Sequence, residues 1–166
     1  MTCCPPSPVR NTGSCDEFLS FPDPTVCTGC NQICAGDPVG RVDNATTYTD
    51  IVKTAWEYTT GERALFATEY AGVALDNIEC DPCQVPPTCL QVVKTDCEFK
   101  MEVSLVANTQ FNKGAMLTLA EDPDNAGQLT PRLYEVTANA AEALFVTAEA
   151  SGVAGKQHKV LVTGRG

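Results

Sequence analysis

The residues best suited to chemistry in this chain are cysteines arranged as two Cys-x-x-Cys pairs. The first pair is Cys27 and Cys30, and the second is Cys80 and Cys83. Four thiolates supplied by two such pairs are the ligands of a tetrahedral structural zinc site. The 49 residues between the pairs exceed the gap of roughly 15–20 residues that is typical of zinc ribbons. A zinc-stabilised Cys4 protein-binding module is therefore our alternative hypothesis.

A thiol-disulfide enzyme is a third interpretation of the same motif. Such enzymes place their Cys-x-x-Cys between a strand and a helix. Here Asp81 and Pro82 separate the second pair within a proline-rich loop, which does not fit that arrangement.

The leading interpretation is that the cysteines form disulfide bonds that cross-link an N-terminal arm and a loop to a β core. All ten are candidates: Cys3, Cys4, Cys15, Cys27, Cys30, Cys34, Cys80, Cys83, Cys89 and Cys97. Six lie in the first 34 residues and the last 69 residues contain none, so the C-terminal part must fold by packing alone. Ten thiols allow 945 pairings, so the connectivity stays open. Disulfides need an oxidising destination, which a chain without an export signal reaches when its cell lyses or when it leaves in a particle.

The remaining chemistry-bearing residues favour neither catalysis nor metal binding. His158 is the single histidine, and we expect it at an exposed turn or strand edge rather than in a Cys-His nucleophile pair. Asp122–Gly127 lacks the spacing of a calcium loop and predicts a solvated turn. Tyr48, Trp56 and Tyr58 form an aromatic group that we expect in the core or at its edge, with a protein-contact patch as the alternative. We therefore predict a protein that is not an enzyme and has no cofactor.

Composition narrows the class of protein further. The 166 residues are 43% hydrophobic, which excludes collagen, coiled coil and wholesale disorder. No window approaches the ~20 apolar residues of a membrane-spanning helix. The net charge of −10, from 21 acidic and 11 basic residues, argues against nucleic acid and anionic membranes as partners. The N-terminus shows no secretory signal, so we expect synthesis in the host cytoplasm without export.

The chain divides into an arm and a β domain. Residues 1–35 hold six cysteines and five prolines and predict an extended arm that is neither strand nor helix. Residues 36–166 are typical of a sheet protein with tight turns. We expect strands at Val39–Val42, Leu65–Thr68, Gly72–Leu75, Leu90–Lys94, Phe99–Val106, Met116–Leu119, Leu144–Ala148 and Lys159–Val162. Short helices are expected at Thr49–Tyr58 and Ala138–Ala143.

An internal repeat indicates how the β domain is built. Ala64–Ala74 matches Ala143–Ala154 at an offset of 79 after one insertion, and a Gly-led apolar segment precedes each copy at similar spacing. We therefore predict a mainly β fold, a β-sandwich or barrel built from a duplicated β unit, with halves at about 36–106 and 107–166.

The order of these motifs resembles a known family. The chain resembles the small β proteins that decorate tailed-bacteriophage heads, also called cement or capsid stabilisation proteins. The resemblance lies in the order of its segments: a strand like Cys97–Val103, then Asn112–Leu117, an Ala-Leu-Phe-Val run and a terminal Lys159–Gly164. The resemblance covers residues 36–166. The arm and the loop Asp81–Thr88 are not part of the family pattern.

The resemblance implies a noncatalytic virion protein on the outer surface of the expanded capsid. Its partners would be neighbouring major capsid protein subunits, which it cements against internal DNA pressure, and further copies of itself, with a homotrimer favoured. The arm would suit strand addition to a neighbour's sheet edge. We expect deletion of residues 1–35 to abolish capsid addition and to leave the β core folded.

Overall fold

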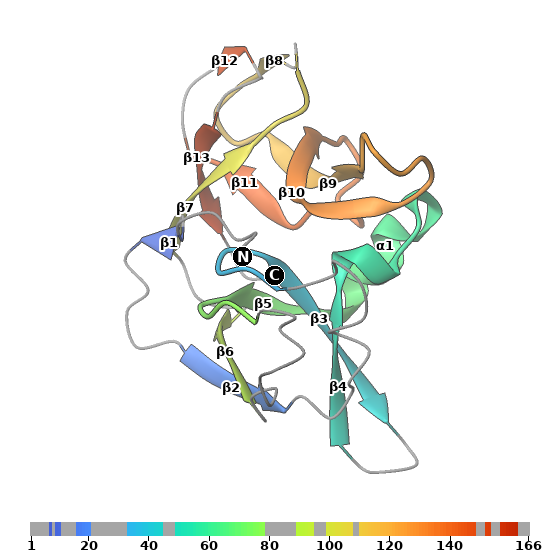
Figure 1. Cartoon of the computed structure of the whole chain (residues 1–166). Helices are drawn as coiled ribbons and strands as arrows, with labels where there is room; N and C mark the ends of the chain where they lie inside the picture. Colours follow the sequence, from blue (N-terminus) through green and yellow to red (C-terminus); the bar gives the residue numbers. More distant parts are fainter. Residues whose placement is uncertain are drawn as a thin grey trace.

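The protein is built mainly of β-strands, arranged in two antiparallel sheets (Figure 1). The computed structural model describes residues 7, 9–10, 16–20, 33–44, 49–78, 89–94, 99–107, 110–148, 152–153 and 157–162. The predicted mainly β class is confirmed.

The first sheet has five strands in the order β2-β6-β5-β3-β4. Its members are β2 (Asp16–Ser20), β3 (Pro38–Asn44), β4 (Thr49–Thr54), β5 (Tyr70–Ala74) and β6 (Cys89–Lys94). Close packing at β5 requires a glycine, because a Cβ on Gly72 would lie 2.1 Å from the carbonyl oxygen of Val93 in β6. The predicted strands at Val39–Val42, Gly72–Leu75 and Leu90–Lys94 correspond to β3, β5 and β6.

The second sheet has six strands in the order β1-β7-β13-β11-β9-β10. Its members are β1 (Val9–Arg10), β7 (Phe99–Ser104), β9 (Met116–Glu121), β10 (Leu129–Val136), β11 (Phe145–Thr147) and β13 (Gln157–Val162). A separate pair joins β8 (Gln110–Phe111) to β12 (Gly152–Val153).

The second sheet closes on itself. Leu105, which follows β7, pairs in parallel with Tyr134 of β10, and the Val106 amide donates to the Tyr134 carbonyl at 2.9 Å. Since β10 is at one end of the sheet order and β7 is next to the other end, this bridge brings the two ends of the sheet together.

β7 shows the clearest agreement between sequence pattern and structure. Phe99, Met101, Val103 and Leu105 are buried, whereas Lys100 between them is exposed. Such an alternation of apolar and polar residues is typical of a strand with one buried face. The predicted strands at Met116–Leu119, Leu144–Ala148 and Lys159–Val162 correspond to β9, β11 and β13.

The helical predictions were wrong, and so was one strand. Thr49–Tyr58 is strand β4 followed by the 3-10 helix Ala55–Glu57, and Ala138–Ala143 is a turn. The expected strand Leu65–Thr68 is instead helix α1 (Arg63–Glu69), which follows the 3-10 helix Thr60–Glu62. One copy of the repeated Ala-Leu-Phe segment is thus helical, and the other leads into β11.

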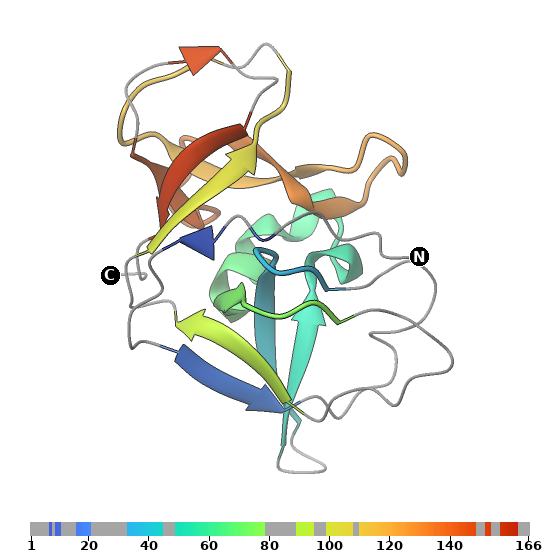
Figure 2. The same cartoon turned by 60° about the vertical axis from the view of Figure 1, so that its left-hand side comes forward.

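Helix α1 lies where the two sheets meet, as both views show (Figures 1 and 2). Its Phe66 and Ala67 are buried. Arg63 connects it to the second sheet, because Nε donates to the Leu119 carbonyl at 2.8 Å and Nη2 lies 3.2 Å from the Glu135 carboxylate. The helix therefore packs against both sheets.

The described parts of the N-terminal 35 residues include two strands. β1 pairs with β7 through Val9 and Arg10, and β2 pairs along all five of its residues with β6. Ile33, Cys34 and Ala35 are buried, and Ile33 pairs with Ile78. Extended backbone from this segment thus adds to edges of the chain's own two sheets.

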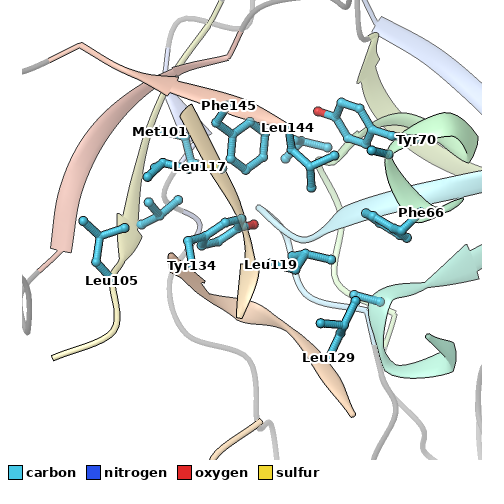
Figure 3. Packing of buried hydrophobic residues seen from close by; sticks show 14 of the residues in the cluster. Phe66, Tyr70, Met101, Leu105, Leu117, Leu119, Leu129, Tyr134, Leu144 and Phe145 are labelled. Carbon is cyan, nitrogen blue, oxygen red and sulfur yellow. The ribbon is translucent and has the colours of Figure 1, made fainter. Parts of the chain in front are cut away.

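One hydrophobic core is shared by both sheets. Phe66 and Tyr70 from the α1–β5 region pack with Leu119, Tyr134 and Phe145 of the second sheet (Figure 3). The ring centroids of Tyr70 and Phe145 are 6.2 Å apart. A smaller cluster fills the first sheet around Val39, Val52 and Leu90.

Candidate functional site

β10 joins the two sheets, and the sequence did not predict it as a strand. At its start, the Leu129 amide donates to the Tyr58 carbonyl at 3.0 Å, and Gln128 pairs with Thr59. Toward its end, Tyr134 pairs with Leu105, which follows β7. Its pairing with β9 shifts register between Leu129 and Tyr134, and Pro131 lies inside that irregularity. Proline disfavours a regular strand interior, which is why the sequence pattern was weak here.

Arg132 extends from the middle of β10 to the segment that precedes β3. Its Nη2 lies 3.6 Å from Asp37 Oδ2 and donates to Cys34 Sγ at 2.7 Å. Its guanidinium carbon lies 5.5 Å from the centre of the Trp56 ring, within the range of a cation–π contact. We call these four residues the joint.

Asp37 is a buried acid in the joint. Its side chain is 8% exposed, and Oδ2 accepts a hydrogen bond from the Cys34 amide at 2.9 Å. Burial raises the pKa of the Asp37 carboxyl from 3.8 to about 6, against the opposing effects of the Cys34 amide and of Arg132. The carboxyl therefore titrates near neutral pH, and its ion pair does not fully offset the loss of water.

Two tyrosines lie near the joint with buried hydroxyl groups. Among the residues that the structure describes, the buried hydroxyls of Tyr134 and Tyr70 and the buried indole nitrogen of Trp56 find no hydrogen-bond partner. Burial raises the pKa of both tyrosines, and Asp37 raises that of Tyr134 further. Both rings pack against Phe145.

The aromatic residues that the sequence singled out separate in the structure. Tyr58 is buried in the shared core, its ring meets Phe66 edge-on, and its hydroxyl donates to Glu69. Burial and the Glu69 carboxylate raise the pKa of Tyr58. Trp56 is half-buried against Arg132. The prediction of core or core-edge positions is confirmed for these two, and Tyr48 lies outside the described residues.

Most cysteine predictions fall outside the described residues. This applies to the candidate zinc ligands Cys27, Cys30, Cys80 and Cys83, and also to Cys3, Cys4, Cys15 and Cys97. Cys89 begins β6 opposite Ser20, and Cys34 is buried in the joint. Within the part of the chain that the structure describes, no group of three or more His, Cys, Asp or Glu side chains could hold a metal ion.

The other two sequence candidates occupy a strand and a turn. The backbone of His158 in β13 pairs with Val103 of β7. In the turn after β9, Asp122 Oδ1 accepts from the Asp124 amide at 3.0 Å and its carbonyl accepts from the Asn125 amide at 3.2 Å. Residues 123–127 are exposed and Gly127 has a φ of 84°. The predicted solvated turn is confirmed.

Neither protein-family models, nor curated proteins, nor solved structures match the chain. In the described residues, no helix has the length and apolar character needed to cross a membrane.

Proposed function

We propose that this protein is a structural virion protein that binds the outer surface of a phage capsid and cements neighbouring major capsid protein subunits. The main support is the order of the strands. Segments that carry the sequence resemblance form β7, β9, β11 and β13, in that order along the chain. All four belong to one six-stranded sheet.

Two further observations support the proposal. Extended segments of residues 1–35 already pair with sheet edges, as β1 and β2 do, so this backbone is suited to strand addition. The net charge of −10 would keep decorated particles apart in solution.

The test is co-sedimentation of the purified protein with undecorated, expanded capsids of the phage that encodes it. We expect saturable binding at a fixed ratio to the major capsid protein and a higher temperature of capsid disruption. Capsids that are already saturated serve as the control and should take up no more protein. Absence of binding to undecorated capsids would overturn the proposal.

A deletion variant tests the role of the N-terminal arm in capsid binding. Deletion of residues 1–35 would remove Ile33, Cys34 and Ala35, which are buried, so it would damage the core as well as the arm. Deletion of residues 1–8 keeps β1 and β2. We expect it to weaken capsid binding while the near-ultraviolet circular dichroism stays unchanged. Normal capsid binding by this variant would remove those eight residues from the mechanism.

A further inference from the structure

Cys34 is held by a disulfide bond within the joint. It is the one cysteine whose side chain the structure describes, and its sulfur is bonded to that of one of the other nine cysteines. The residue is 1% exposed. Its amide donates to Asp37 Oδ2 at 2.9 Å, and its carbonyl accepts from the Asp37 amide at 2.9 Å. The backbone and the sulfur of Cys34 are therefore both fixed within the fold.

The burial of Cys34 decides which sulfur of this bond a thiol can attack. A disulfide is reduced when a thiolate attacks one of its sulfurs and expels the other as a thiolate. Attack at Cys34 Sγ would need open space beside this atom, but the residue is buried and the Arg132 guanidinium donates to the sulfur at 2.7 Å. Attack at Cys34 is therefore blocked, which leaves the partner sulfur as the site of attack and makes Cys34 the leaving group.

Arg132 is placed to stabilise the Cys34 thiolate that this attack would release. A positive charge beside a sulfur favours its thiolate form, and a more stable thiolate leaves faster. The guanidinium carbon lies 5.5 Å from the centre of the Trp56 ring, which holds the side chain in place. Asp37 offsets part of the charge, but Nη2 lies closer to the sulfur, at 2.7 Å, than to the carboxylate, at 3.6 Å.

We propose that the disulfide of Cys34 undergoes directed exchange with small thiols such as glutathione, in which Cys34 is always the leaving group. The glutathione thiolate forms a new S–S bond with the partner sulfur, the original S–S bond breaks, and its electron pair goes to Cys34 Sγ. The products are a mixed disulfide at the partner cysteine and a Cys34 thiolate beside Arg132. A second glutathione thiolate then attacks the mixed disulfide and releases oxidised glutathione. This exchange does not depend on whether the protein binds capsids.

The first test identifies the cysteine that carries glutathione. The folded, full-length protein is incubated with reduced glutathione, its free thiols are alkylated, and its peptides are mapped by mass spectrometry. The untreated protein, mapped in the same way, identifies the partner of Cys34. We expect alkylated Cys34 and glutathione on its partner. Glutathione on Cys34 with an alkylated partner would overturn the proposal, and so would a Cys34 bond that stays intact until the protein unfolds.

The second test separates a chemical role of Arg132 from a structural one. We expect Arg132→Gln to slow the release of the Cys34 thiol by about threefold or more, because the leaving thiolate loses its stabilising charge. A merely structural role predicts the opposite sign, because a looser joint would expose the bond and speed its reduction. Arg132→Lys keeps the charge and should retain part of the rate.

Arg63→Gln is the matched control, because Arg63 links α1 to the second sheet without contact to Cys34. It should leave the release rate unchanged. Unchanged or faster release in Arg132→Gln, or equal slowing in both glutamine variants, would overturn the proposal.

Discussion

Asp37 shows how a single residue makes the fold sensitive to pH. Its side chain is nearly enclosed, and its carboxyl titrates at about 6 instead of 3.8. The folded protein therefore binds this proton more tightly than the unfolded chain does. Its contribution to the free energy of unfolding is fully present below pH 3.8 and is lost as the pH rises through about 6.

Asp37→Asn should remove this contribution. The shift corresponds to on the order of 3 kcal/mol. We expect the difference in free energy of unfolding between the original protein and Asp37→Asn to change by that order between pH 4 and pH 7, in favour of the original at low pH. Urea denaturation across this range measures it. Asp124→Asn, at an exposed turn, is the matched control for the change of a carboxylate to an amide.

The burial of side chains could be predicted from the sequence where it follows one simple pattern along a strand. The alternation in β7 followed from side-chain polarity alone. The contacts of the joint could not be predicted in this way, because Arg132 is far in sequence from Cys34 and Asp37 and the fold of β10 brings them together. A buried Asp–Arg pair has no local sequence signature.

At the scale of elements, identical local sequences gave different structures. Ala64-Leu65-Phe66 lies in α1, whereas Ala143-Leu144-Phe145 enters β11. The helical copy follows a capping box, in which the Glu62 carboxylate accepts from the Thr59 amide at 2.9 Å. Thr59-x-x-Glu62 was the sequence signal that could have identified the start of the 3-10 helix that leads into α1.

Substitutions on α1 test this assignment. Ala64 and Thr68 are exposed, so their effects should reflect backbone preference. In a helix, Ala64→Val should lower the free energy of unfolding by about 0.5 kcal/mol and Thr68→Ala should raise it by a similar amount. Both signs would reverse in a strand. Val146→Ala in β11 is the control and should destabilise the protein.

At the scale of the whole molecule, the cysteines decide between the two hypotheses for function. Each well-placed disulfide restricts the conformations of the unfolded chain and contributes about 2–4 kcal/mol to the free energy of unfolding. A zinc site instead makes folding depend on metal binding. Either arrangement would secure the N-terminal segment, which β1 and β2 attach to both sheets.

Native mass spectrometry separates these outcomes. For a decoration protein we expect a metal-free trimer whose denatured chain has lost ten hydrogens, one for each cysteine. Treatment with a chelator should leave Tm unchanged, and a reductant should lower it. A monomer with one zinc per chain and reduced thiols would instead support the Cys4 module.

The position of β10 also limits how the sequence of this protein can change in length. Leu129 is fixed at Tyr58 and Tyr134 at Leu105, so the four residues between these anchors span a set distance. One inserted residue would have to be absorbed within the irregular stretch that contains Pro131, because otherwise Tyr134 would turn away from the core. Changes of length in β10 are therefore confined to that stretch, whereas the exposed turn at residues 123–126 can vary in length without moving either anchor.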